Sequence, residues 1–228
     1  MTHLHIPDGI LPIRIWMLGI ILMALAIGFS VHRLRSLNLM KKIPLLGAVS
    51  AVMLVAMSLE ILPLAYHINL SVVAGIMLGP SLGFLAAFIA NLILAFMGHG
   101  GITVIGLNTL LLGSEAVLGH TLYSLFSRWP SVFWRAAMAT LLTLMATTMA
   151  LVGIVALSGI DPEFHHHADG HAPVAEGRDS ISTFASLVLS LGSIGWIIEA
   201  AITGAVVKFI SQVKPGLLDH VRRRAEDI

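Results

Sequence analysis

The sequence contains no cysteine and few charged residues. None of its 228 residues is a cysteine, which excludes disulfide bonds, thiolate metal sites and cysteine nucleophiles. Only 11 % of the residues are charged and 57 % are hydrophobic, whereas a soluble domain carries about 25 % charged residues. So few charges cannot cover a water-facing surface, and the composition therefore predicts an integral membrane protein and excludes a soluble enzyme. The formal net charge of +1 favours neither a nucleic-acid partner nor an acidic substrate.

Apolar runs bounded by proline, glycine and charge divide the chain. A membrane-spanning helix needs about 20 apolar residues, so six or seven spans fit and a second folded domain does not. The third run is too short to cross alone and predicts a half-span or a tilted helix. The runs cover approximately 13–31, 43–62, 72–78, 82–97, 103–126, 132–157 and 184–210. We expect one all-α membrane domain over 1–228 with about seven transmembrane helices, a histidine-rich extracytoplasmic loop at 159–181 and a cytoplasmic basic tail at 212–228.

Lysine and arginine residues set the predicted orientation, because cytoplasmic connections carry an excess of both. If the first span runs from outside to inside, 11 of the 13 basic residues fall on the cytoplasmic side. Only Arg14 and Arg178 then lie outside. The sequence thus predicts a multi-pass protein of the inner cell membrane with an extracytoplasmic amino terminus and a cytoplasmic carboxy terminus.

The histidines sort in the opposite direction. The same topology places 8 of the 11 histidines outside, although no rule of topology requires it. Imidazole is the commonest metal ligand, and a nitrogen-rich site without thiolates suits Ni(II), Cu(II), Co(II) or Zn(II). The eight outer histidines are His3, His5, His67, His99, His165, His166, His167 and His171.

The amino terminus, MTHLHIPDG, is the sharpest candidate metal site. A free amine, deprotonated backbone amides and a nearby imidazole can form fused chelate rings around a square-planar ion, the geometry of Ni(II) or Cu(II). Met1 precedes the small residue Thr2, and if Met1 is removed, His3 becomes the second residue. A frayed tail that carries two histidines by chance fits the composition equally well.

Three further segments hold candidate ligands. His67 and Asn69 form a His-x-Asn pair beside the short third run, as in transporter sites built at interrupted helices. The alternative is a Tyr–His pair that lies among the lipid headgroups. His99 lies in a glycine-dense turn, which either brings backbone close to an ion or only packs tightly. A loop tract typical of a weak metal antenna, or of an irrelevant soluble loop, contains His165, His166, His167 and His171.

Polar residues inside the spans are costly in lipid and therefore raise a functional hypothesis. They are Glu60, Asn91, Asn108, Glu115, His120 and Glu199. For Asn91, Glu115 and His120 we favour hydrogen bonds between helices. A stripe of small residues predicts close helix packing, and it comprises Gly75, Gly79, Gly83, Ala86, Ala87 and Ala90. The sequence has no nucleophile elbow, intramembrane metalloprotease motif or P-loop, so an enzyme is a weak interpretation.

Three motifs resemble the CbiM/NikM family, the substrate-binding membrane subunits of energy-coupling-factor transporters for cobalt and nickel. They are HIPDGILP from His5, LGPSLGF from Leu78, and GHGGITVIGLN from Gly98 to Asn108. The resemblance covers residues 5 to about 126 with specific motifs and continues to the end as a pattern of spans. It implies seven helices with the amino terminus inserted into the bundle from outside.

The resemblance also implies a ligand set. In the family, the terminal amine, the amide and imidazole of a histidine at position two, and a second histidine near the second helix hold the ion. His67 stands where that second histidine belongs. His5 matches the first histidine by motif, whereas His3 matches it by distance from the terminus once Met1 is lost. The residues that would line or brace the same cavity are His99, Asn69 and Asn108.

The function implied by the resemblance is capture of Co(II) or Ni(II) as the transported substrate, by a subunit without its own ATPase. The implied partners are two ATP-binding subunits, a coupling transmembrane subunit and often a small accessory membrane protein, all in the lipid bilayer. The alternative is a stand-alone secondary nickel or cobalt permease or exporter. A third hypothesis, from another class, is an intramembrane hydrolase that uses His67 and Glu199.

Overall fold

The computed structural model describes residues 8–9, 11–35, 42–61, 66–157 and 177–218. Several residues singled out by the sequence lie outside these ranges. They are His3, His5, His165, His166, His167 and His171, together with most of the loop at 159–181 and the tail beyond residue 218.

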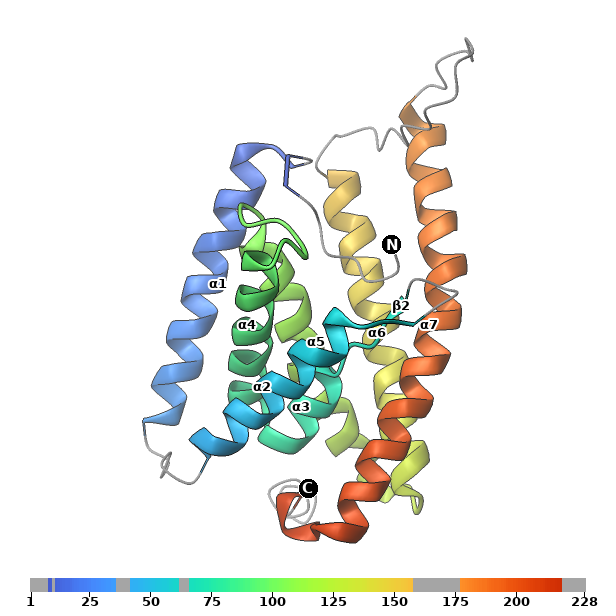
Figure 1. Ribbon diagram of the computed structural model, residues 1–228. Coiled ribbons are helices and arrows are strands. Elements are labelled where there is room, and N and C mark those ends of the chain that lie inside the picture. Colours follow the sequence, from blue (N-terminus) through green and yellow to red (C-terminus); the bar gives the residue numbers. More distant parts are fainter. Residues whose placement is uncertain (1–7, 10, 36–41, 62–65, 158–176, 219–228) are drawn as a thin grey trace.

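Seven α-helices make up the described chain (Figure 1). They are α1 (Ile13–Leu34), α2 (Ile43–Ser58), α3 (Ser71–Leu78), α4 (Pro80–Phe96), α5 (Ile105–Leu125), α6 (Val132–Leu157) and α7 (Gly177–Val213). The shorter elements are the 3-10 helices η2 (Phe126–Arg128) and η3 (Pro215–Leu218), and an antiparallel pair of two-residue strands, β1 (Glu60–Ile61) and β2 (Tyr66–His67). The predicted helical membrane fold with a short third helix is confirmed.

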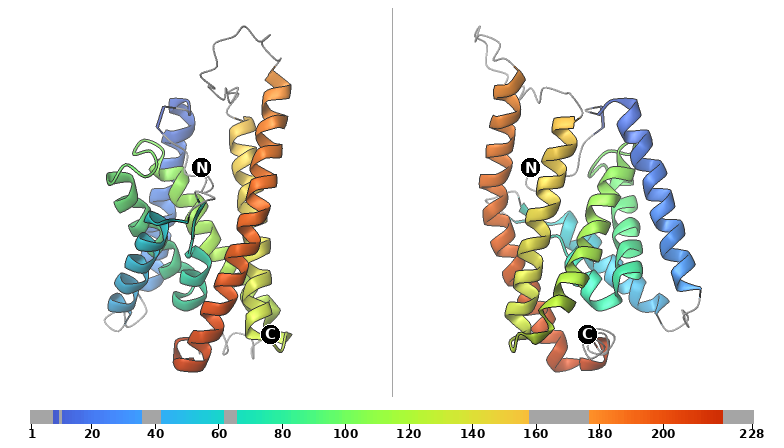
Figure 2. Two further views of the ribbon diagram at one scale, coloured as in Figure 1. Left: turned by 45° about the vertical axis from the view of Figure 1, so that its right-hand side comes forward. Right: turned by 180° about the vertical axis from the view of Figure 1, so that it is seen from behind.

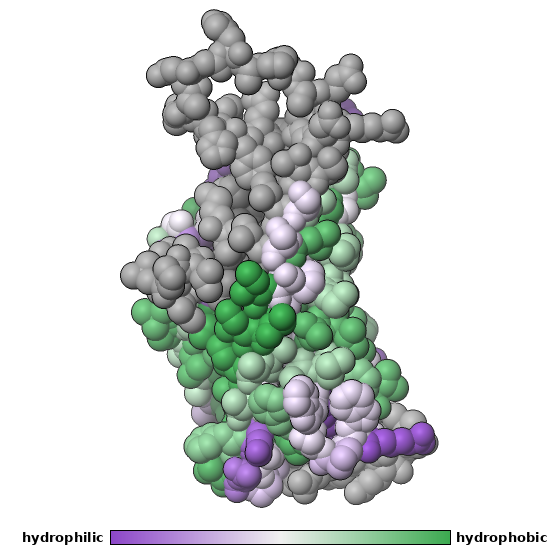
Figure 3. Space-filling model, turned by 90° about the vertical axis from the view of Figure 1, so that its right-hand side faces the viewer, coloured by the Kyte–Doolittle hydropathy of each residue, from purple (hydrophilic) through white to green (hydrophobic). Residues whose placement is uncertain are grey.

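The outer surfaces of the helices suit a lipid environment. Three described segments, α1, α6 and Val188–Val213 of α7, are long and apolar enough to cross a membrane. Large apolar side chains face outward, among them Leu25 of α1 at 65 % exposure and Ile197 of α7 at the same value. The face shown in Figure 3 is apolar over its middle and has strongly hydrophilic side chains near its lower end. Such a surface is stable only against hydrocarbon.

Two helix boundaries differ from the sequence-based prediction. The second apolar run was expected to continue to Leu62, but α2 ends at Ser58 and β1 begins at Glu60. Apolar residues fit a short strand as well as a helix end, so hydrophobic pattern alone does not separate the two. The last helix begins at Gly177, before the apolar run, because polar residues also form helix beyond the hydrocarbon layer. The early end of α2 matters more, because the chain after it forms two short strands and His67 lies on the second of them.

Small residues bring α3, α4 and α5 into backbone contact, as the stripe predicted. A Cβ atom at Gly75 would lie 1.9 Å from the carbonyl oxygen of Ala116, and one at Gly83 would lie 2.8 Å from the Cα atom of Gly75. Gly79 separates α3 from α4 with a φ of +84°, a conformation that favours glycine, and Pro80 then begins α4. These three helices therefore form a close-packed joint.

Polar side chains inside the spans link neighbouring helices. Asn91 of α4 donates to the Thr109 hydroxyl of α5 at 2.8 Å and to the Ile105 carbonyl at 3.3 Å. The His120 ring of α5 lies 3.1 Å from the Gly75 carbonyl of α3. The helix–helix hydrogen bonds expected for Asn91 and His120 are confirmed.

The described lysines and arginines gather mainly at one end of the bundle, which we call the basic end. The end of α1, the start of α2, the α5–α6 connection and the end of α7 meet there (Figures 1 and 2). Its cationic residues are Arg33, Arg35, Lys42, Arg128, Arg135, Lys208 and Lys214. We call the opposite end, formed by the chain around Asp8 and the turn 97–104, the loop end.

Candidate metal-capture site

The chain around His67 lies in the part of the fold where the helices are too short to span a membrane. At 1.5 Å per residue, the 16 residues of α2 reach about 24 Å and the 8 residues of α3 about 12 Å. Neither crosses a hydrocarbon layer of about 30 Å. The strands between them pair Glu60 with His67 and Ile61 with Tyr66. Non-helical backbone at this depth needs polar partners inside the protein.

Asn69 supplies several of those contacts. Its backbone N–H donates to the Glu199 carboxylate of α7 at 3.0 Å, and its side-chain amide donates to the Glu115 carboxylate of α5. Its side-chain oxygen accepts from the Ser71 N–H at 2.8 Å, at the start of α3. Asn69, Glu115 and Glu199 are all buried. The segment that follows His67 is therefore fastened to two long helices.

A third helix joins this network through Thr147. The Thr147 hydroxyl of α6 donates to the Glu115 carboxylate at 3.2 Å. Glu115, expected to form hydrogen bonds between helices, thus binds both α6 and the segment before α3. We call Asn69, Glu115, Thr147 and Glu199 the Asn69 network. The sequence indicates Asn69 and Glu199 as separate candidates, but not their contact, since 130 residues separate the two.

The structure brings His67 and His99 together. Their ring centroids are 6.3 Å apart, with the ring planes at 89°. His67 is half-buried and His99 is exposed. Gly98 and Gly100 have φ values of +82° and +98°, so the glycines that flank His99 allow the chain to turn sharply there. The sharp turn thus leaves the His99 ring exposed and beside that of His67.

Asp8 fastens the start of the chain to the same turn. Its carboxylate accepts from the Ile102 N–H at 2.9 Å, the Thr103 N–H at 2.8 Å and the Thr103 hydroxyl. The Thr103 hydroxyl is the largest cause of a lowered pKa for Asp8, followed by the Thr103 N–H. A Cβ atom at Gly101 would lie 2.5 Å from the Asp8 carboxylate. We call these contacts the Asp8 latch. Asp8 belongs to the motif HIPDGILP, but no pattern in the sequence indicates this contact.

The described residues do not form a complete metal site by themselves. Within the described ranges, no group of three or more histidine, aspartate, glutamate or cysteine side chains is placed to hold a metal ion. Asn108 is buried in the first turn of α5. The roles predicted for Asn108 and for the amino-terminal histidines remain predictions.

This fold is shared with two solved structures of transition metal transporters. The structure matches a truncated transition metal transporter with a TM-score of 0.74 over 92 % of this chain and 99 % of that one, and a second transition metal transporter with a TM-score of 0.75 over 96 % and 99 %. Both are 22 % identical in sequence, so the likeness defines the class of fold.

The chain belongs to the CbiM family, described as the cobalt uptake substrate-specific transmembrane region, whose profile matches residues 5–217. It is 30 % identical to a predicted fused nickel transport protein, NikMN, of Archaeoglobus fulgidus, over 95 % of this chain and 68 % of the relative. It is 31 % identical to a predicted metal transport protein of Haloquadratum walsbyi, over 94 % of this chain and 93 % of the relative. The family resemblance of the motifs is confirmed.

Proposed function

We propose that this protein is the substrate-specific membrane component of an energy-coupling-factor importer for Co(II) or Ni(II). Family membership supports transition-metal transport, and the Asp8 latch is the observation that carries the mode of capture. The latch ties the amino-terminal segment to the turn that presents His99, and the His99 ring lies 6.3 Å from the His67 ring. Three segments distant in sequence thus converge at one place.

Chain length supports a ligand role for the terminal histidines. His5 precedes Asp8 by three residues and His3 precedes it by five. An extended chain covers at most about 3.6 Å per residue, so the Cα atom of His5 stays within about 11 Å of the Asp8 Cα atom, and that of His3 within about 18 Å. Either imidazole therefore stays near the Asp8 latch, and we propose that one of them binds the ion together with His67.

Nitrogen chemistry supports Co(II) or Ni(II) as the substrate. His67, one terminal imidazole, backbone amides and the terminal amine would surround the ion, with His99 and Asn108 bracing the site. Imidazole suits these ions, and the set lacks the carboxylates and thiolates that favour harder or softer metals. Ligands must lose protons to bind, so capture releases protons. The Asn69 network holds His67 in place during binding.

Energy for transport comes from partner proteins in this proposal. The sequence has no P-loop, so two ATP-binding subunits and a coupling transmembrane subunit supply the driving force, with a small accessory membrane protein as a further partner. The excess of Lys and Arg supports a cytoplasmic location for the basic end and a location outside the inner membrane for the loop end. The loop histidines His165, His166, His167 and His171 collect ions weakly near the entrance.

Metal titration of the purified full chain tests the capture site. Calorimetry with NiCl2 and CoCl2 compares the native terminus, a blocked terminus, His3→Ala, His5→Ala and His67→Ala. His32→Ala is the matched control, since His32 is an exposed imidazole in the last turn of α1 at the basic end. We expect loss of stoichiometric binding with His67→Ala, with the blocked terminus and with one terminal variant. Unchanged binding in all of them would refute this site.

The dependence on partners is tested separately in cells. Uptake of labelled Co(II) or Ni(II) should require the ATP-binding and coupling subunits and should stop when their ATPase is inactivated. Uptake by this chain alone would instead establish a secondary permease. Deletion of residues 165–171 should reduce uptake at scarce metal and leave the affinity of the purified site nearly unchanged.

A further inference from the structure

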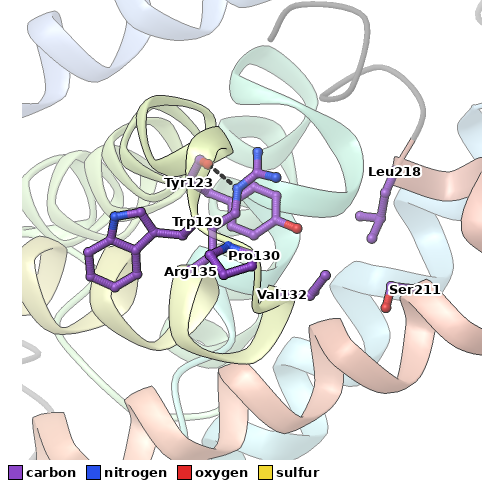
Figure 4. Close-up of a pocket in the computed structure, with 7 residues that line it drawn as sticks. All are labelled: Tyr123, Trp129, Pro130, Val132, Arg135, Ser211 and Leu218. Atoms are coloured by element: carbon purple, nitrogen blue, oxygen red, sulfur yellow. Dashed lines mark hydrogen bonds between the residues drawn. The ribbon is translucent and has the colours of Figure 1, made fainter.

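A cavity at the basic end lies far from the candidate metal site. It has a volume of about 170 Å³ and lies where α5, α6, α7 and η3 meet. The residues that line it are Tyr123, Trp129, Pro130, Val132, Arg135, Ser211 and Leu218 (Figure 4). Nothing in the capture of a metal ion uses this cavity.

Arg135 is held in one orientation inside the cavity. Its Nε–H donates to the Tyr123 carbonyl at 2.6 Å, and its guanidinium carbon lies 3.9 Å from the centre of the Tyr123 ring. Figure 4 shows the two side chains against each other, with Trp129 on one side and Leu218 on the other. A guanidinium is planar and suits two-point recognition of phosphate oxygens. An arginine already fixed by a ring loses less conformational freedom when it binds an anion.

The charges around the cavity favour an anion. Four described cations lie on the segments that form the cavity or its edge, namely Arg128, Arg135, Lys208 and Lys214. The carboxylates whose side chains the structure describes, those of Asp8, Glu115 and Glu199, belong to none of the residues that line it. Lys208 of α7 and Lys214, the residue after α7, lie three residues before and after Ser211. The summed field of the described residues is therefore positive where Arg135 lies.

The surface beside the cavity is apolar and aromatic. Leu125 is 69 % exposed, Trp134 59 %, and Phe209 63 %, and all three lie within one helical turn or so of residues that line the cavity. Tryptophan at such a position is typical of the membrane–water interface. A ligand for this place thus combines a phosphate group for Arg135 with hydrocarbon for the neighbouring helix faces.

We propose that this cavity binds the phosphate headgroup of an anionic phospholipid, with its acyl chains along the exposed ends of α5, α6 and α7. Basic pockets between transmembrane helices on the cytoplasmic side recognise such headgroups in this way. The lipid joins η3 and the end of α7 to the α5–α6 connection. This site is independent of the proposed metal transport.

Lipid binding to the delipidated full chain tests the proposal. Native mass spectrometry compares how many phosphatidylglycerol molecules and how many phosphatidylcholine molecules with identical acyl chains the protein retains. Arg135→Gln should reduce phosphatidylglycerol binding about fivefold or more, and Arg135→Lys should reduce it less, because one cation near the surface contributes on the order of 1 kcal/mol. Arg33→Gln is the matched control, since Arg33 also stacks on a ring, that of Phe29 at 5.0 Å, but lies outside the cavity.

A second variant keeps the test decisive if Arg135→Gln does not fold. Ser211→Trp fills the cavity and leaves Arg135 in place, so it should also reduce phosphatidylglycerol binding without changing Ni(II) or Co(II) affinity. Equal losses of phosphatidylglycerol binding with Arg33→Gln and Arg135→Gln would mean that the lipid is attracted by the general positive charge of the basic end. That result would overturn the proposed site. Full displacement by glycerol 3-phosphate would show a site for soluble phosphates instead. Loss of assembly with the coupling subunit at unchanged lipid binding would show a protein-docking surface and also refute the proposal.

Discussion

The two ends of the bundle use charge in different ways. At the loop end, the Asp8 carboxylate accepts hydrogen bonds from Ile102 and Thr103, so its charge fastens one chain segment to another. At the basic end, Arg33 and Arg135 lie over aromatic rings, and the described part of that end contributes cations only. At the loop end, a carboxylate with three donors joins two segments distant in sequence. At the basic end, the described cations have no described carboxylate beside them, and Arg135 is held by a ring and a backbone carbonyl instead.

The joint of α3, α4 and α5 connects the two ends, and its disruption should have the largest effect. Gly75→Ala places a Cβ atom 1.9 Å from the Ala116 carbonyl oxygen, and the three nearest atoms all belong to the Ala116 backbone. We expect a loss of about 3 kcal/mol or more in the free energy of unfolding, since an overpacked core cannot relax there. Denaturation with sodium dodecyl sulfate, followed by tryptophan fluorescence, measures it.

Gly28→Ala is the matched control for this substitution. Gly28 is in the middle of α1 and nothing lies within 4 Å of its Cβ position. The substitution should leave stability unchanged or raise it by up to about 1 kcal/mol, because alanine is the better helix former. Equal effects of the two variants would show that α3 and α5 are not in backbone contact.

Asn69→Ala should affect both stability and metal binding. It removes the side-chain donor to the buried Glu115 carboxylate and frees the segment after His67. A buried polar group that loses its partner costs about 1–3 kcal/mol. Asn91→Ala removes a buried asparagine of the α4–α5 contact and should destabilise the fold similarly, with no loss of Ni(II) affinity. If both variants bind metal equally well, the Asn69 network does not position His67.

Sequence patterns predicted the elements of the fold better than the contacts of the site. Long apolar runs gave α1, α4, α5 and α6 with ends within a few residues, because hydrocarbon thickness and helix rise fix their length. The β1–β2 pair was missed, because two-residue strands between apolar residues have no periodicity of their own.

The contacts that shape the site join residues far apart in the chain. Asp8 meets Thr103 across 95 residues, and Asn69 meets Glu199 across 130. Each contact pairs a side chain with a backbone N–H, and every residue offers such a donor, so no sequence motif marks it. The histidines could be recognised as candidates by type and topology, whereas the meeting of His67 with His99 required the fold.

Asp8→Ala should weaken metal binding moderately and leave the helices intact. The latch acts through the amino-terminal segment, and groups that orient metal ligands typically change affinity by about 10- to 100-fold. Thr103→Val removes only the hydroxyl and keeps both backbone donors, so its effect should be smaller. Calorimetry with NiCl2 on the purified chain provides the measurement. Wild-type affinity in Asp8→Ala, together with loss in His67→Ala, would refute the latch and leave the metal site standing.

The smallest expected effect is the contribution of the latch to pH dependence. Hydrogen bonds, first from the Thr103 hydroxyl, hold the pKa of Asp8 below its ordinary value of 3.8. A carboxylate with a lowered folded-state pKa contributes fully above that ordinary value and loses its contribution as the pH falls through the folded-state pKa. Between pH 7 and pH 5 the latch should therefore contribute nothing to the slope of metal affinity against pH. Wild type and Asp8→Asn should give parallel profiles, offset by a constant factor. Profiles that converge toward pH 5 would show that Asp8 becomes protonated in that range, contrary to the hydrogen bonds it accepts at the loop end.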